Sequence, residues 1–268
     1  MPNYICVTCG TQYPESDQAP AHCPICEDER QYIGANGQQW TTLEALRPTT
    51  HMIIEQAEPK LLRLKPEPKV GIGQYAFLVQ TPNGNVLWDC VPFIDDATIQ
   101  AINDLGGIHA IAISHPHFHT AMVEWSRAFN DAPIYIHAGN QPFVMRPDPA
   151  VKFWDGETLP LLDGITLVRG GGHFPGSAML HWRDGAEGRG VLLTADTIDV
   201  VQDTRWVTFM YSYPNLIPLP PSKVRRIVAS VDPFNYDRVY EGFGFVVDGD
   251  AKAKVHASAD RYIRAMSE

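Results

Sequence analysis

The sequence predicts an α+β fold, in which sheet layers are covered by helices, preceded by a small cysteine-rich module. Two CxxC pairs lie in an N-terminal stretch that has no long apolar segment. After residue 50, short β-branched runs alternate with segments of helical spacing, which is typical of mixed sheet and helix layers. We therefore expect two domains, a cysteine module over residues 1–47 and a larger domain over residues 48–268.

The cysteine module is too rich in turn formers to bury a core that folds without a staple. Cys6 and Cys9 form one CxxC pair, and Cys23 and Cys26 form a second. This spacing lets both sulfurs of a tight turn face one ion, so we expect four thiolates around one metal. Two disulfides are the alternative, which the absence of an export signal disfavours.

The segment CVTCGTQYPESDQAPAHCPIC resembles the rubredoxin-like or zinc-ribbon module of rubrerythrin-type proteins. The resemblance covers about the first thirty residues and implies a tetrahedral four-thiolate site for zinc or iron. We predict structural zinc, because the sequence shows no second redox motif to receive electrons. Gly10, directly after the first pair, is expected in the left-handed conformation that such a turn needs.

The larger domain follows a predicted linker, Arg47-Pro48-Thr49-Thr50, whose first residue is expected to be extended because it precedes proline. Alternating or β-branched apolar runs predict strands over 51–56, 60–64, 74–81, 86–90, 108–114, 134–137, 165–169, 178–182, 190–195 and 238–240. Asn83-Gly84 predicts a hairpin. Helical spacing predicts helices over 95–105, 122–129, 222–231 and 251–265.

The acidic composition limits the partners that we expect. A formal net charge of −10 would repel a phosphate backbone, so nucleic-acid binding is disfavoured. No basic stretch precedes an apolar run at the N-terminus, and no long apolar run occurs, so we expect a soluble, cytoplasmic protein without membrane contact. A small-molecule substrate is the expected partner, and a homo-oligomer is allowed.

Three histidines follow the apolar run over 108–114. His115, His117 and His119 alternate along the turn after this run, where loop geometry can direct them into one cleft. Pro116 argues against a continuing strand. Because a lone histidine is usually structural but three convergent imidazoles are typical of a metal site, we expect metal binding here.

Two further candidate ligands lie downstream. His173 follows Gly170, Gly171 and Gly172, which permit a sharp backbone, and Asp196 ends the strand predicted over 190–195. Each has an ordinary alternative, because a glycine-flanked histidine can be a turn residue and an aspartate after a strand is often a helix cap.

Taken in order, these residues resemble the metallo-β-lactamase superfamily, whose pattern is HxHxDH after a strand, a Gly-His, an Asp after a later strand, and a final histidine. The resemblance spans roughly residues 70–245 and includes the hairpin YAFLVQTPNGNVLWD, which ends at Asp89. It implies a four-layer αββα sandwich. It also implies metal ligation by His115, His117, His173 and Asp196, the last able to bridge to a second metal.

Three positions depart from the family pattern. His119 replaces the second-site aspartate, Thr120 replaces the adjacent histidine, and Tyr240–Phe243 replaces the final histidine region. We therefore expect one metal and an altered second site, in which His119 is a candidate ligand. His256, in the last predicted helix, is expected to be a surface residue.

The resemblance implies a metal-dependent hydrolase that activates water for attack on an ester, thioester, lactone or related small substrate. Asp196 and His119 are the expected catalytic residues, and zinc is the expected metal, with iron or manganese as alternatives. A non-catalytic metal-binding or scaffold protein and an iron-dependent redox protein remain as other functions. The aromatic segment 205–221 is interpreted as a substrate lid or subunit contact, or as a buried loop.

Overall fold

The computed structural model describes residues 1–267. These residues form two compact units, one made of Met1–Ile136 with Gln141–Phe153 and the other of His137–Asn140 with the described residues from Trp154 onward. The expected domain boundary at residue 47 stays a prediction. Among residues 1–267, no helix is both long enough and apolar enough to cross a membrane.

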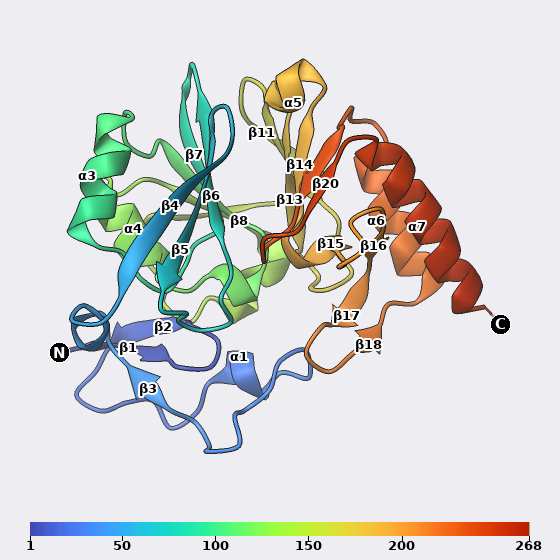
Figure 1. The fold of residues 1–268 in the computed structure, drawn as a ribbon. Helices are drawn as coiled ribbons and strands as arrows, with labels where there is room; N and C mark the ends of the chain where they lie inside the picture. The colour runs from blue at the N-terminus through green and yellow to red at the C-terminus, as the bar shows by residue number, and fades with distance from the viewer. Residues whose placement is uncertain (268) are drawn as a thin grey trace. The chain divides into compact units, whose positions relative to one another are not determined.

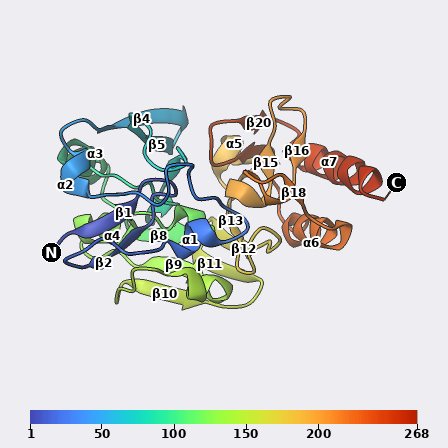
Figure 2. The ribbon, with the colours of Figure 1, turned by 90° about the horizontal axis from the view of Figure 1, so that it is seen from below.

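The first unit begins with a three-stranded sheet in the order β2-β1-β3 (Figure 1), and Figure 2 also shows β1 and β2 side by side. Its strands and the two short helices beside them are β1 (Asn3–Cys6), β2 (Gln12–Glu15), α1 (Pro24–Glu27), β3 (Trp40–Thr41) and α2 (Leu43–Leu46). Proline in the first turn favours the start of α1, because this position needs no amide donor. The side chain of Thr42 caps α2 by accepting a hydrogen bond from the Ala45 amide.

A seven-stranded sheet in the order β10-β9-β8-β7-β6-β5-β4 forms the rest of the first unit, with α3 (Asp96–Asp104) and α4 (Met122–Ala128) beside it in Figure 1. Its strands are β4 (His51–Glu58), β5 (Leu61–Glu67), β6 (Ala76–Thr81), β7 (Gly84–Trp88), β8 (Ala110–Ile113), β9 (Ile134–His137) and β10 (Val151–Trp154). β8 is parallel to both β7 and β9 and is buried along its length. The apolar run AIAI therefore forms the centre of the sheet, and the histidine turn leaves from its end.

The second unit contains a six-stranded sheet in the order β11-β12-β13-β14-β19-β20. Its strands are β11 (Thr158–Leu162), β12 (Ile165–Arg169), β13 (Ala178–Trp182), β14 (Val191–Leu193), β19 (Arg238–Tyr240) and β20 (Val246–Asp248). Helices α6 (Pro221–Val231) and α7 (Ala251–Ala265) lie on one side of it. The buried side of α6 has the i, i+3, i+4, i+7 spacing of an amphipathic helix, through Val224, Ile227, Val228 and Val231.

Short elements complete the second unit. They are α5 (Gly185–Gly188), β15 (Asp199–Val200), β16 (Val207–Thr208), β17 (Met210–Ser212) and β18 (Ile217–Pro218). β15 pairs with β16, and β17 pairs with β18, so the aromatic segment 205–221 contains one strand of the first pair and both strands of the second.

The expected strands and helices of the larger domain are present, but the conformation expected for Arg47 is wrong. Its φ of −48° and ψ of −40° are helical, at the C-terminal end of α2. The amide of Arg47 donates to the Leu43 carbonyl at 3.0 Å, and this helical bond outweighs the preference of a residue before proline for extended backbone.

Candidate metal centres

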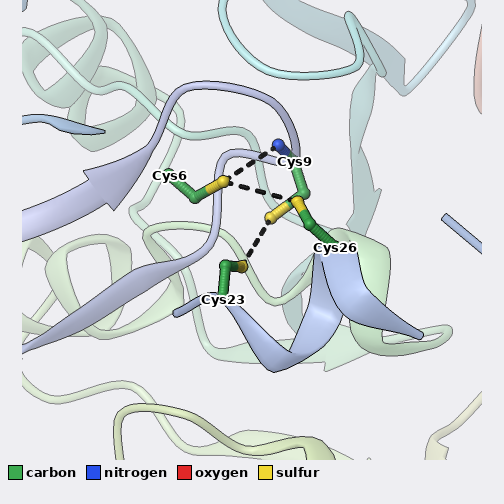
Figure 3. A group of neighbouring side chains, drawn as sticks. All are labelled: Cys6, Cys9, Cys23 and Cys26. Atoms are coloured by element: carbon green, nitrogen blue, oxygen red, sulfur yellow. Dashed lines mark hydrogen bonds between the residues drawn. The ribbon is translucent and has the colours of Figure 1, made fainter. Parts of the chain in front are cut away.

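Four buried cysteines of the first unit bring their sulfurs together (Figure 3). Cys6 ends strand β1 and Cys9 lies in the turn after it, whereas Cys23 precedes helix α1 and Cys26 lies in it. The Cys6 and Cys26 Sγ atoms are 3.5 Å apart, and those of Cys9 and Cys23 are 3.6 Å apart. The structure therefore gathers the two CxxC pairs into one cluster, as the sequence predicted.

The spacing of these sulfurs fits a tetrahedral metal. Zinc–sulfur bonds of about 2.3 Å place neighbouring thiolates about 3.8 Å apart in a tetrahedron, whereas a disulfide needs about 2.05 Å. All five cysteines are free, and Cys90 is buried away from the cluster's donor set. Gly10 has the expected left-handed conformation, with φ of +80°. The donor set fits either zinc or iron.

Polar groups surround the sulfurs of the cluster. Gln38 Nε2 donates to the Cys6 sulfur at 3.1 Å, and the Tyr13 hydroxyl donates to the Cys23 sulfur at 3.2 Å. Hydrogen bonds from Cys23 and Cys26 lower the pKa of Cys6, whereas burial raises the pKa of Cys9. Donors aimed at sulfur favour the thiolate form that a metal requires.

The histidine turn, which we define as residues 114–120, starts from a fixed point at the end of β8. Asp89 follows β7 with φ of +63°, and its carboxylate accepts a hydrogen bond from the Ser114 amide at 2.7 Å. The Asp89 amide in turn donates to the Ala112 carbonyl at 2.8 Å. Asp89 therefore has a structural role, because it fixes the point where the histidine turn leaves the sheet.

His115 and His117 are fully buried neighbours in this turn. Their ring centroids are 5.1 Å apart, and their ligand nitrogens lie within 4.8 Å of each other. His115 is extended, and Pro116–Phe118 forms a single 3₁₀ turn, which brings alternate side chains to one side. The Ser114 hydroxyl lies 2.9 Å from Nδ1 of His115, which assigns metal binding to Nε2 of that ring.

His119 lies in the same turn but belongs to neither set of donor atoms suited to a metal among the described residues. Its Nδ1 lies 3.2 Å from the Phe143 carbonyl, so Nδ1 carries the proton and donates it. Burial lowers the pKa of His119 to about 3, which keeps the ring neutral. Its expected roles as ligand and catalytic residue stay predictions.

His173 belongs to the second unit and follows a tightly packed glycine loop. A Cβ on Gly170 would lie 2.6 Å from Thr197 Cγ2, and one on Gly172 would lie 2.8 Å from Ile227 Cδ1. The glycines thus allow close packing as well as the positive φ of Gly171 and Gly172. Nδ1 of His173 donates to the Tyr211 carbonyl of β17 at 2.8 Å, which fixes the ring.

Asp196 lies beside His173 in the second unit. It is buried in a 3₁₀ turn, Ala195–Thr197, just after β14. Its Oδ2 is 3.7 Å from Nε2 of His173. Two ligands at about 2.0–2.2 Å from one ion lie roughly 3–4 Å apart, so this pair fits adjacent positions around a metal.

The donor types of these four side chains suit a transition metal. They are two histidines of the first unit and a histidine and an aspartate of the second. Imidazole and carboxylate are ligands that zinc, iron and manganese accept, so the set fits the expected metals without choosing among them.

Two carboxyls near Asp196, the half-buried Asp199 and the buried Glu241, were not predicted from the sequence. Burial, together with the nearby Glu241 and Asp196 charges, raises the pKa of Asp199 to about 9. Burial likewise raises the pKa of Glu241 to about 7, although the Phe243 and Phe245 amides donate to its carboxylate. Glu241 follows β19, which is parallel to β14, so it reaches the same sheet edge as Asp196. The TADTID segment was the only signal for Asp199.

Segment 205–221 is partly core and partly exposed. Phe209 and Leu219 are buried in the apolar cluster of the second unit, whereas Leu216 is 76% exposed at the tip of the β17–β18 hairpin. The Tyr213 ring lies 5.9 Å from the His173 ring, centroid to centroid. The segment therefore helps to position His173, and its role as a lid or subunit contact stays a prediction.

The expectation for His256 is met. His256 is a surface residue of α7 and pairs with Asp232 at 2.7 Å.

Comparison with known proteins gives one full-length relative. No protein-family model matches the chain. The chain is 52% identical over 269 aligned positions to the "Uncharacterized protein YmaE" of Bacillus subtilis (strain 168), and the match covers 100% of this chain and 98% of YmaE.

Solved structures show the same fold. The DIM-1 metallo-β-lactamase aligns with a TM-score of 0.59 and 13% identity, over 80% of this chain and 98% of its own. VMB-1 aligns with a TM-score of 0.58 and 12% identity, over 81% and 98%. The metallo-β-lactamase FIM-1 from Pseudomonas aeruginosa in the mono-zinc form aligns with a TM-score of 0.58 and 13% identity, over 81% and 96%. The predicted fold class is confirmed.

Proposed function

Given that the chain belongs to the same family as YmaE of Bacillus subtilis and has the metallo-β-lactamase fold, we propose that it is a metal-dependent hydrolase. The proposed substrate is a small ester, thioester, lactone or related molecule. Fold alone does not set a reaction, so the proposal depends on the chemistry of the site residues.

One observation carries the proposal. Each unit offers a pair of buried donors, His115 with His117 and His173 with Asp196, and a neighbouring polar group engages Nδ1 of one histidine in each pair, which leaves its Nε2 for a metal. We propose that the two pairs bind a single cation. FIM-1 has been solved in a mono-zinc form, so a protein of this fold can be obtained with a single zinc ion.

A cation at this site would supply an acidified water, with a pKa near 7 instead of about 15.7, and would polarise a substrate oxygen. We propose zinc, with iron or manganese as alternatives, and structural zinc at the cysteine cluster. His119 is the proposed proton acceptor, through Nε2, because its Nδ1 proton is donated to Phe143. The low pKa of His119 makes it a weak base, so we expect slow turnover or a specialised substrate.

A non-catalytic metal-binding protein is the second candidate. The specific observation in its favour is the replacement of the family's aspartate and histidine by His119 and Thr120, which alters the second metal site. An iron-dependent redox protein would require iron at the cysteine cluster. We propose a cytoplasmic location, because CxxC cysteines without disulfides persist in reducing compartments. The proposed partner is a small-molecule substrate, with no nucleic acid or membrane, and the chain could also form a homo-oligomer.

The test compares wild-type protein with His117→Ala on a panel of esters, thioesters, lactones and phosphodiesters. We expect wild type to turn over at least one substrate, and His117→Ala to lose both the metal of the histidine site and turnover. Full turnover by the metal-free variant would contradict the proposal. Metal bound with no turnover would favour the non-catalytic candidate, and charge-transfer bands of an iron–thiolate site would favour the redox candidate.

A further inference from the structure

The cysteine module contacts the histidine turn directly within the first unit. The Gln12 amide of β2 donates to the Thr120 carbonyl at 3.1 Å. Thr120 is buried and has φ of +33°. A β-branched residue with positive φ is strained and persists only where its surroundings hold it, so the bond from Gln12 stabilises a conformation that the turn would not keep alone.

The loop that carries Cys9 packs against the same residue. Gly10 follows Cys9, and a Cβ at this position would lie 3.0 Å from Pro92 and 3.5 Å from the Thr120 methyl. The Gly10 amide donates to the Cys6 carbonyl at 2.8 Å, so its position depends on the CxxC turn. A change in the conformation of the CxxC turn would therefore move Gly10 and alter its packing against Thr120.

Arg146 links the module to the helix that follows the histidine turn. Its side chain is 7% exposed, and Nη1 donates to both Gln12 Oε1 and Glu124 Oε1, the latter at 2.5 Å. Gln12 belongs to β2, and Glu124 belongs to α4. A buried guanidinium with two fixed acceptors orients both elements, because losing it would leave buried acceptors unpaired.

Phe143 makes the third link. Its ring packs against the cysteine cluster, and the Arg30 guanidinium lies 5.5 Å from the ring centroid. Asp28 holds Arg30 through two bonds of 2.6 Å. The carbonyl of Phe143 accepts the Nδ1 proton of His119 at 3.2 Å, so the residue that covers the cysteines also orients an imidazole of the turn.

From these contacts we propose that the cysteine module supports the histidine turn, and that Arg146, Gln12 and Phe143 are positioning residues for the metal-binding His115 and His117. The inference rests on the metal site of the proposed function but does not require turnover. Coupling between two sites is reciprocal, so metal at the cysteine cluster and metal at the histidine site should each strengthen the binding of the other by the same factor.

The first experiment replaces Arg146 by methionine in the full chain and measures Co²⁺ and Zn²⁺ affinities by chelator competition. Cobalt absorption separates a thiolate site from an imidazole and carboxylate site. We expect about tenfold or more weaker binding at the histidine site, because changing groups that orient metal ligands typically costs 10–100-fold. The matched control is Arg127→Met on α4, whose exposed side chain pairs with Asp148 at 3.2 Å and should leave the affinity unchanged.

A second pair of variants, Gln12→Ala and Gln12→Glu, tests the same contact in case Arg146→Met does not fold. Gln12→Ala removes the acceptor that Arg146 uses and should also weaken the histidine site, whereas Gln12→Glu keeps an acceptor and should retain the wild-type affinity. Rescue by Gln12→Glu would show that the acceptor for Arg146 at position 12 carries the effect on metal affinity.

Histidine-site affinities within twofold of wild type in Gln12→Ala and in any folded Arg146→Met protein would overturn the inference. The same conclusion would follow if Gln12→Glu were as weak as Gln12→Ala. These affinities are independent of catalysis. If wild type has no activity but the variants show that the two sites are coupled, only the proposed hydrolase function is contradicted. If wild type is active but the two sites are not coupled, only this inference is contradicted.

Discussion

Asp199 is half-buried and Glu241 is buried near Asp196, and the carboxyl groups of both keep protons to unusually high pH. The pKa of Asp199 rises to about 9 and that of Glu241 to about 7, first because of burial and then because of neighbouring carboxylates. Between their unfolded and folded pKa values, these two carboxyls therefore bind more protons in the folded state than in the unfolded state. The stability that Asp199 contributes is full at low pH and is lost as pH rises through its folded pKa.

Asp199→Asn should reduce this pH dependence in metal-free protein, because only the part that Glu241 contributes would remain. We expect the variant to lose less unfolding free energy than wild type between pH 5 and pH 9, measured by denaturant titration. Asp203→Asn is the matched control, because Arg205 lowers the pKa of Asp203 to about 2 and its titration lies below this window. Parallel profiles for wild type and Asp199→Asn would contradict the assignment.

The four cysteines and the alternating histidines could be predicted as metal ligands from the sequence. CxxC pairs and alternating histidines are patterns that coordination geometry imposes on the local chain, so the sequence indicated them. Asp199 and Glu241 carry no such local pattern. Their shifted pKa values come from burial and from the parallel pairing of β14 with β19, which only the folded chain shows.

At the scale of elements, the glycine loop before His173 leaves strand β12 and packs against α6. Gly172 has φ of +79°, and a Cβ there would lie 2.8 Å from Ile227 Cδ1 of α6. Gly156 has φ of +89° but open space around its Cβ position. A side chain at Gly156 would therefore introduce only backbone strain, whereas a side chain at Gly172 would introduce both backbone strain and steric overlap.

Gly156→Ala should cost roughly 1–2 kcal/mol of unfolding free energy, from left-handed strain alone. Gly172→Ala should cost about 1–3 kcal/mol more, because the added methyl overpacks α6, and it should weaken metal binding by displacing His173. Denaturant titration and chelator competition measure the two effects. Equal losses in both variants would show that Ile227 yields without cost.

Long apolar runs predicted most strands and helices because their periodicity survives without tertiary context. β8 and α6 are examples, since burial follows the pattern of their side chains. β3, β15 and β18 have two residues each, too few to show a periodicity, and they are defined by their pairing with β1, β16 and β17. The helical Arg47 likewise reflects the capping bond of α2 and not its own preference.

At the scale of the whole chain, the ligand set is divided between the two units. The first unit holds the complete cysteine cluster and the pair His115 and His117, whereas the second holds His173 and Asp196. A metal shared by both pairs would link segments far apart in the sequence. It would also stabilise the folded chain, because an ion bound only in the native state favours that state by mass action.

The most direct test of this shared metal is the number of ions that remain bound after dialysis against a moderate chelator. Wild type should retain two ions per chain, one for each donor set. His117→Ala and His173→Ala, in different units, should each retain only the cysteine-site ion. His181→Gln should behave as wild type, because the Asn235 carbonyl engages Nε2 of His181 outside either set. Retention of both ions by His117→Ala or His173→Ala would contradict a single metal held by the two pairs.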